Sequence, residues 1–424
     1  MTSSTGRRGV MPSLSTLVTS PPPSSSSDPT RRLVPPGETV DLTTTVKRTV
    51  TSLPTPTIRT PRRDQSIDTL RGIAVIAMVA GHVVGSTADN GMTVADDSLW
   101  RHLYTLFADL RMPLFTALSG FVYALRPVSS KEAFPRFLLG KVRRLLVPLV
   151  TVGTVFMVTQ ALLPGANSNA PLSRWWTVYV VETAHFWFLQ AVFVILIVVA
   201  LIDLLGLDDR PVTSALWIAG TGLLSLTVTV YGFPFYVFSL DRAVELLPFF
   251  LVGRALCRHR SRREGDRPFF LVGRALCWFD GGTGRAGWVF LATAIVLFLA
   301  RFADIFLDVD LTALQSGILG TLLGLSGIAA LICFRQRLTW APLARLGYFS
   351  FAIYLLHVFG VAGSRVALSA LGVENEVAVF VTGLICGIAL PVVFEVTLGR
   401  ISWISWAFLG QRAYVPAKTR RSSI

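Results

Sequence analysis

Charged residues are scarce in this chain, and their scarcity limits the class of protein it can be. Of its 424 residues, 15% are charged and 52% are hydrophobic, whereas about a quarter of an ordinary soluble domain is charged. Cysteine is also rare: Cys257, Cys277, Cys333 and Cys386 lie in or beside apolar segments, without the spacing of metal ligands. We therefore expect an integral membrane protein with neither a disulfide framework nor a metal.

Acidic residues are too few to balance the basic ones, and the formal net charge is +14. Such a charge is compatible with a nucleic-acid partner, but the basic residues fall in clusters between apolar runs and form no continuous basic face. We expect no nucleic acid as a partner. The clusters instead resemble the signals that orient helices in a lipid bilayer.

Residues 1–65 contain no apolar run long enough for the core of a signal peptide, and they are rich in Ser, Thr and Pro. This composition predicts a disordered tail, held on the cytoplasmic side by its basic residues. Residues 66–400 form the predicted membrane domain. Residues 401–424 are predicted to be a cytoplasmic C-terminal tail.

Long apolar segments dominate the rest of the chain. A helix that rises 1.5 Å per residue needs roughly 20 apolar residues to cross a bilayer. Ten segments approach this length: 68–87, 106–126, 145–163, 186–206, 212–232, 234–256, 287–303, 311–334, 348–371 and 376–398. The predicted fold is an all-α polytopic bundle of about ten transmembrane helices.

The loops between these segments predict the orientation of the bundle. The second, sixth and eighth loops are basic, and the first, seventh and ninth are acidic or neutral. Because basic loops stay in the cytoplasm, both termini are predicted to be cytoplasmic, in the inner (plasma) membrane. The fourth loop, Asp203 to Arg210, is predicted to be cytoplasmic and yet is acidic.

One internal repeat is identical in all ten residues. The segment PFFLVGRALC occurs at 248–257 and again at 268–277. Ten residues cannot cross a bilayer, so we interpret the second copy as a local duplication in the sixth loop that lies at the membrane interface.

The first apolar segment carries ionisable residues that are costly in a membrane and therefore suggest function. Arg71 and His82 are eleven residues apart, which at about 100° per residue places them on nearly the same helix face, roughly 16.5 Å apart. Asp68 lies one turn before Arg71 and can pair with it. The alternatives are that Arg71 only reaches toward the interface and that His82 only bonds between helices.

Several motifs, taken together, resemble one family. They are IDTLRGIAVIAMVAGH at 67–82, MPLFTALSGF at 112–121, KVRRLLVP at 141–148, HFWFL at 185–189, LPFFLVG at 247–253 and LGYFSFAIYLLH at 346–357. In this order they resemble the acyltransferase 3 family of membrane-bound O-acyltransferases acting on carbohydrates. The resemblance covers about residues 64–400.

The resemblance implies a ten-helix O-acetyltransferase that uses acyl-CoA, normally acetyl-CoA, as donor and an envelope carbohydrate or glycolipid as acceptor. It implies that Arg71 and His82 are essential. The basic pair that follows the second helix in the family corresponds to Lys141 and Arg144. A lysine stands here where the family has arginine, so the bidentate phosphate contact of an arginine is lost at this position.

The chemistry of acyl transfer gives these residue types roles. A sugar hydroxyl needs a base to take its proton, and neutral imidazole suits that task, which makes His82 the predicted base. Arg71, Lys141 and Arg144 are predicted to bind the donor. Ser119, Tyr354 and backbone N–H groups are alternative donors to the oxyanion.

Other residues have open roles. His357 and Arg111 are supporting candidates in or beside apolar segments, where His357 has a purely structural hydrogen bond as its alternative. Trp175, Trp176 and Trp187 are interpreted as an interfacial aromatic belt, with a sugar-stacking platform as the alternative. The competing function for the whole chain is a transporter or flippase of an envelope precursor, although paired repeats typical of transporters are not evident.

Overall fold

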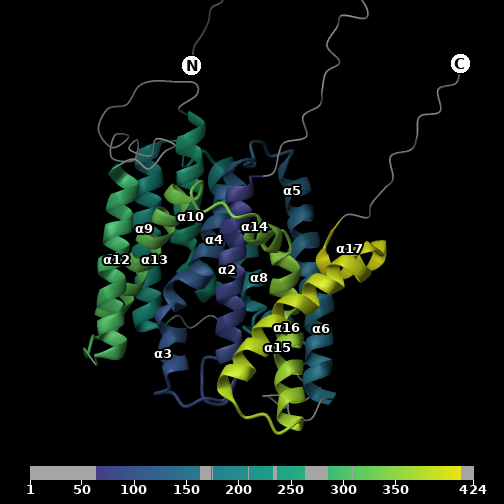
Figure 1. The fold of residues 1–424 in the computed structure, drawn as a ribbon. Helices are drawn as coiled ribbons and strands as arrows, with labels where there is room; N and C mark the ends of the chain where they lie inside the picture. Colours follow the sequence, from purple (N-terminus) through teal and green to yellow (C-terminus); the bar gives the residue numbers. More distant parts are fainter. Residues whose placement is uncertain are drawn as a thin grey trace, which may run out of the picture. The chain divides into compact units, whose positions relative to one another are not determined.

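The computed structural model describes residues 64–411, except 163–172, 174, 209, 233–235, 263–284 and 308. Residues 1–63 of the predicted tail and the second copy of the repeat therefore lie outside the described residues. The described chain is helical, and it contains no strand apart from a single bridge between Val181 and Val237. The predicted all-α membrane bundle is confirmed (Figure 1).

Each of the ten predicted apolar segments contains one long helix. These are α2 (Gln65–Val84), α4 (Ala108–Ala124), α6 (Val147–Leu162), α8 (Trp187–Leu204), α9 (Pro211–Tyr231), α10 (Leu240–Arg262), α12 (Arg285–Phe306), α13 (Ala313–Phe334), α15 (Ser350–Ala370) and α16 (Glu376–Thr397). Among the described residues, eight helices are long and apolar enough to cross a membrane. The two below that standard are α4, with 17 residues, and α10, which carries charges along its length.

Shorter helices connect the long ones. They are α3 (Leu99–Leu106), α5 (Phe134–Lys141), α7 (Thr177–Val180), α14 (Ala341–Tyr348) and α17 (Ser402–Leu409). A π-helix, Val142–Leu146, joins α5 to α6, and a short 3₁₀ helix, Leu398–Arg400, precedes α17. Local chemistry sets several boundaries: Asp64 caps the start of α2, and Gly85, at φ 84°, ends it.

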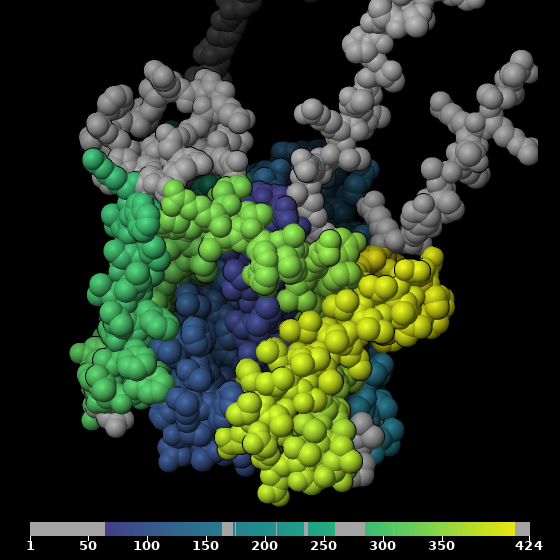
Figure 2. Space-filling model, in the orientation of Figure 1, coloured from purple at the N-terminus to yellow at the C-terminus, as the bar shows by residue number. Residues whose placement is uncertain are grey.

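Helix α2 lies inside the bundle, and α12 lies at its edge (Figure 1). In α2, 67% of the apolar stretch is buried, against 6% in α12. The space-filling view shows α2, in purple, recessed behind the yellow and light green surfaces of α16 and α14 (Figure 2). The exposed apolar side chains of α12, such as Val296 and Leu299, are those expected to face lipid.

Glycines allow the closest helix contacts. A Cβ added at Gly253 of α10 would overlap the carbonyl oxygen of Ala117 in α4, and one at Gly120 of α4 would overlap that of Phe250. Small residues permit such backbone approach where apolar burial cannot drive helix association. The first copy of the repeat, which contains Phe250 and Gly253, is therefore a tightly packed part of α10.

The acidic fourth loop has a structural explanation. Buried Arg254 of α10 donates to both Asp203 and Asp208, Tyr123 Oη donates to Asp203 Oδ2 at 2.7 Å, and Arg258 Nη1 lies 3.4 Å from Asp208 Oδ2. The two carboxylates of the loop neutralise the basic end of α10. The negative charges of this loop are therefore neutralised by ion pairs inside the bundle.

The packed chain continues beyond residue 400. Arg144 Nη1 donates to the carbonyl oxygen of Leu409 at 2.7 Å, and Arg143 Nε donates to that of Gly410 at 3.2 Å. Gly410, at φ 59°, ends α17 in the left-handed conformation. Residues 401–411 of the predicted tail are thus attached to α6 and to the π-helix before it, because arginines satisfy the last carbonyls of α17.

Candidate active site

A cavity of about 1460 Å³ opens among α2, α4, α8, α10, α13 and α15. Its lining comes from the end of the bundle at which α2 finishes: it includes Gly85, Asn90, Gln160, Glu182 and Arg365. The end at which α2 begins, where Arg71 lies, contributes nothing to it. The cavity therefore occupies one side of the bundle, the side that loop charges predict to be extracytoplasmic.

Three histidines from three separate parts of the chain meet at this cavity. The ring centroids of His82 and His357 are 4.7 Å apart, those of His185 and His357 are 5.0 Å apart, and those of His82 and His185 are 6.3 Å apart. His82 belongs to the last turn of α2, His357 to α15, and His185 to the turn that precedes α8. Among the described residues, no group of three His, Cys, Asp or Glu side chains is arranged to hold a metal ion.

The cluster has a buried part and an accessible part. His185 and His357 are 2% and 0% exposed, whereas the His82 ring is exposed to the cavity, although it lies deep in the protein. Burial and, to a smaller extent, His357 lower the pKa of His185 well below its ordinary value. His82 and His185 both line the cavity, and His82 is the more exposed of the two to a ligand there.

Backbone carbonyls determine which nitrogens carry protons. His357 Nδ1 lies 3.0 Å from the carbonyl oxygen of Ile353 and 2.9 Å from that of Tyr354, so Nδ1 carries the donated proton, which in a neutral ring leaves Nε2 as an acceptor. His185 Nε2 likewise donates to the carbonyl oxygen of Leu355 at 3.2 Å. The remaining nitrogens, His185 Nδ1 and His357 Nε2, are buried without a hydrogen-bond partner in the described chain.

Tyr354 fixes the turn that carries His185. Its hydroxyl donates to the His185 carbonyl oxygen, and its ring plane is inclined at 71° to that of His185, with centroids 5.7 Å apart. The hydroxyl proton of Tyr354 is thus already donated to a backbone carbonyl oxygen. Tyr354 also lines the cavity, so it supports the cluster from α15.

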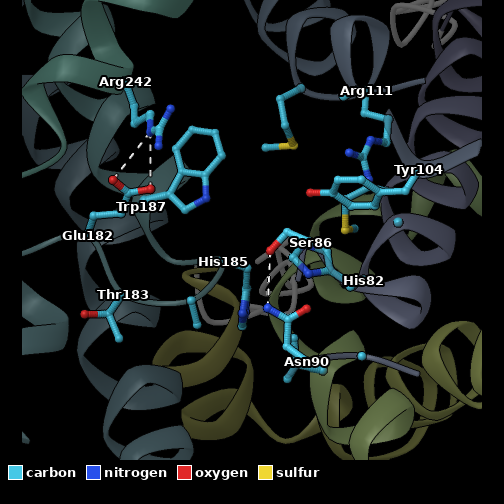
Figure 3. Close-up of a pocket in the computed structure, with 18 of the residues that line it drawn as sticks. His82, Ser86, Asn90, Tyr104, Arg111, Glu182, Thr183, His185, Trp187 and Arg242 are labelled. Atoms are coloured by element: carbon cyan, nitrogen blue, oxygen red, sulfur yellow. Dashed lines mark hydrogen bonds and ion pairs between the residues drawn. The ribbon is translucent and has the colours of Figure 1, made fainter. Parts of the chain in front are cut away.

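Arg111 lies beside His82 on the cavity wall. Its guanidinium carbon is 4.1 Å from the centroid of the Tyr104 ring, and its Nη1 occupies the space that a Cβ at Gly81 would need. No carboxylate of the described chain lies within ion-pair distance of it. Figure 3 shows Arg111 and Tyr104 on one side of the cavity, with His82 and His185 below them.

The other predicted site residues lie away from this cavity. Arg71 Nη1 pairs with Asp68 Oδ1 at 3.2 Å, as their spacing predicts, near the start of α2. Lys141 Nζ lies 5.1 Å from the centroid of the Phe137 ring, and Arg144 binds the end of α17. Ser119 Oγ donates to the carbonyl oxygen of Phe115 within its own helix. The structure brings together His82, Arg111, Tyr354 and His357, and leaves Arg71, Asp68, Lys141, Arg144 and Ser119 outside the cavity.

Sequence reasoning missed several residues that line the cavity. His185 entered only as part of a motif, and Glu182, Arg242, Glu245 and Arg301 received no role. The last three lie within apolar helices, where an ionisable side chain is itself a functional signal. A search of every apolar segment for ionisable residues, and not only of the first segment, would have found Arg242, Glu245 and Arg301.

The fold and the site define a helical membrane protein with a cluster of three histidines beside its cavity. Residues 64–396 match the model of the acyltransferase 3 family, which is described as an acyltransferase domain. The match covers most of the chain, and the protein belongs to this family. Comparisons with curated proteins and with solved structures gave no match.

Proposed function

We propose that this membrane acyltransferase moves an acyl group, normally acetyl, from acyl-CoA to a hydroxyl of an extracytoplasmic glycan or glycolipid. The observation that carries the proposal is the histidine cluster at the cavity: one accessible imidazole, His82, is backed by two buried ones. Membership of the family supplies the reaction class, and the cavity supplies room for an acceptor. Together they favour a transferase over a transporter or flippase.

The proposed chemical step uses His82 as the base. The hydroxyl proton of the acceptor passes to His82 as the hydroxyl oxygen attacks the thioester carbonyl carbon. A C–O bond forms, and the carbonyl oxygen becomes an oxyanion. When the intermediate collapses, the C–S bond breaks, and the CoA thiolate takes the proton from the imidazolium, which restores neutral His82.

His357 and His185 are proposed to position His82. The ring centroids of His357 and His82 are 4.7 Å apart, and Nε2 of His357 has no hydrogen-bond partner in the described chain. That acceptor suits a ring N–H of His82, and such a contact leaves the other His82 nitrogen unprotonated for catalysis.

Arg111 is proposed to stabilise the oxyanion. The sequence left Ser119, Tyr354 and the backbone as candidates, but both hydroxyl protons are donated to carbonyl oxygens of the protein. Arg111 lines the cavity beside His82, and stacking on Tyr104 holds its guanidinium in place. A fixed cation at this point favours the charge that develops during transfer.

A Gly81→Ala substitution tests the placement of Arg111. The new Cβ would displace Arg111 Nη1, which is the end of a flexible side chain, so the guanidinium moves while the fold survives. We expect an unchanged unfolding temperature and a loss of acyl transfer of roughly 10²-fold, the typical effect of removing one oxyanion donor. Gly220→Ala, on α9 in open space, is the matched control and should retain full activity. Normal activity of Gly81→Ala would contradict the role of Arg111.

The donor side of the proposal rests on the family resemblance. Arg71, Lys141 and Arg144 are proposed to hold the phosphates of acyl-CoA at the end of the bundle where α2 begins. With about 16.5 Å of helix rise between Arg71 and His82, an extended pantetheine arm suits the distance between them. The two substrates then approach His82 from opposite sides of the membrane.

The proposed orientation predicts where reporter domains will lie. A reporter fused after Arg263 should be cytoplasmic, because the adjoining loop is basic, and one fused after Asp308 should be outside. Accessibility of each reporter to a membrane-impermeant label measures this directly. A reversed pair would refute the cytoplasmic placement of both termini.

The function itself is tested with membranes that contain the protein, labelled acetyl-CoA and an envelope extract. Ester-linked label in the carbohydrate fraction, released by mild alkali and identified by mass spectrometry, is the expected result. Movement of envelope material across the membrane without ester formation would instead support the transporter alternative. Glycans from cells with and without the gene should differ by the same ester.

A further inference from the structure

The charges that line the cavity are balanced. Four arginines and four carboxylates contribute to the wall: Arg111, Arg242, Arg301, Arg365, Asp89, Asp109, Glu182 and Glu245. A site for the phosphates of CoA needs an excess of cations, and the basic residues proposed for that task lie elsewhere. The balance indicates that the cavity receives an uncharged polar molecule.

One wall carries a group of paired charges beside an aromatic ring. Arg242 Nε lies 3.2 and 3.4 Å from the two carboxylate oxygens of Glu182, and its Nη1 lies 3.0 Å from Glu245 Oε2. The guanidinium carbon is 5.8 Å from the centroid of the Trp187 ring. Figure 3 shows Glu182, Arg242 and Trp187 together, across the cavity from Arg111 and Tyr104.

These side chains remain open to a ligand. The side chains of Arg242, Glu182 and Glu245 are 39%, 29% and 25% exposed, and all line the cavity with Trp187. Each carboxylate has more acceptor sites than one arginine occupies. Trp187 is thus available for the sugar-stacking alternative, whereas Trp175 and Trp176 do not line the cavity and are about half exposed, at 48% and 51%.

We propose that Glu182, Trp187, Arg242 and Glu245 form the subsite for the acceptor, and that the ligand is an uncharged sugar ring. Carboxylates held by arginine accept hydrogen bonds from neighbouring sugar hydroxyls, and the apolar face of the ring stacks on Trp187. The opposite wall, with His82 and Arg111, then faces a hydroxyl of the bound sugar. The assignment of this bound sugar as the acceptor rests on the proposed function. The binding of the sugar does not, because it is measurable without catalysis.

The binding experiment uses the purified full chain in nanodiscs. Its probes are methyl α-D-glucopyranoside, methyl α-D-mannopyranoside and methyl α-L-rhamnopyranoside, with glucose 6-phosphate as a charged comparison. At least one neutral glycoside should raise the unfolding temperature in a saturable way, and glucose 6-phosphate should do so much less. If no glycoside binds, or if only the phosphorylated sugar binds, the inference is overturned.

Variants assign the binding to this wall. Glu182→Gln and Trp187→Ala should each weaken glycoside binding at least tenfold, since each removes one strong contact. Glu376→Gln is the matched control, because Glu376 accepts a hydrogen bond from Trp100 Nε1 at 2.9 Å away from the cavity; it should bind normally. Unchanged binding in both wall variants would overturn the inference.

Catalysis separates this inference from the proposed function. Release of free CoA thiol by the wild-type protein, with acetylation of the glycoside, tests acyl transfer. In Glu182→Gln, the KM for the glycoside should rise about tenfold while the KM for acetyl-CoA stays unchanged. Glycoside binding without any acyl transfer would refute the proposed function and leave the sugar subsite standing.

Discussion

Replacing His82 by alanine is expected to lower the rate of acyl transfer by about 10²–10⁴-fold, the usual contribution of a positioned base. His82 is the most exposed imidazole of the cluster at the cavity, whereas His357 and His185 are buried. Acyl-CoA binding should survive, because the proposed phosphate contacts lie at the other end of α2. Single-turnover assays and binding of radiolabelled acetyl-CoA measure the two effects separately.

Arg71→Ala should fail in the opposite way. It should weaken acyl-CoA binding, and Arg71→Lys should restore part of that binding as a point charge. His102→Ala is the matched control, because His102 packs on Phe306, with ring centroids 5.2 Å apart, outside the cavity lining. If His82→Ala retained turnover, or lost donor binding as completely as Arg71→Ala, this division of roles would have to be abandoned.

Replacing Arg254 by methionine is expected to lower the free energy of unfolding by about 3–5 kcal/mol. The side chain of Arg254 is 2% exposed, and those of its partners Asp203 and Asp208 are 5% and 1% exposed. Without the guanidinium, two buried carboxylates are left with Arg258, which is more distant and more exposed. The change is measured by thermal unfolding in detergent, with the loss of monomeric protein as the signal.

The repeat provides a control with identical local sequence. Arg274 has the same place in the second copy of PFFLVGRALC as Arg254 has in the first. Arg274→Met should leave thermal stability near that of the wild type, and the triple variant Asp203→Asn, Asp208→Asn, Arg254→Met should recover part of the loss. Equal destabilisation by Arg254→Met and Arg274→Met would show that the buried network does not explain the effect.

Local patterns predicted the helices well, because a membrane span is set by its own length and composition. Even α4 and α10, which fall short of that standard, overlap predicted segments, although α10 runs six residues beyond its segment. The acidic loop at Asp203 did not fit, because the rule of basic cytoplasmic loops counts charges without their partners. Arg254, its partner, lies about fifty residues further along the chain.

The residues of the candidate site also divide into those that the sequence predicted and those that it did not. His82 and Arg71 stand out because an ionisable residue in an apolar run is visible in one segment. The spacing between them gave a shared helix face, but it could not tell which of the two faces a cavity. His185 carried no local signal, since a histidine in an aromatic turn is ordinary until its neighbours are known.

The sequence by itself determined the class of protein, the all-α membrane bundle and the family, because these depend on composition, segment length and ordered motifs. Only the tertiary structure decided that His82, His185 and His357 form one cluster, and that Arg242 joins Glu182 and Glu245 across a cavity from it. Each of the three histidines is more than a hundred positions from the next, and Arg242 is sixty positions from Glu182. Their distances are set by which helices pack together. Close contacts such as those of Gly120 with Phe250 and of Gly253 with Ala117 fix that packing through backbone geometry, which no single segment encodes.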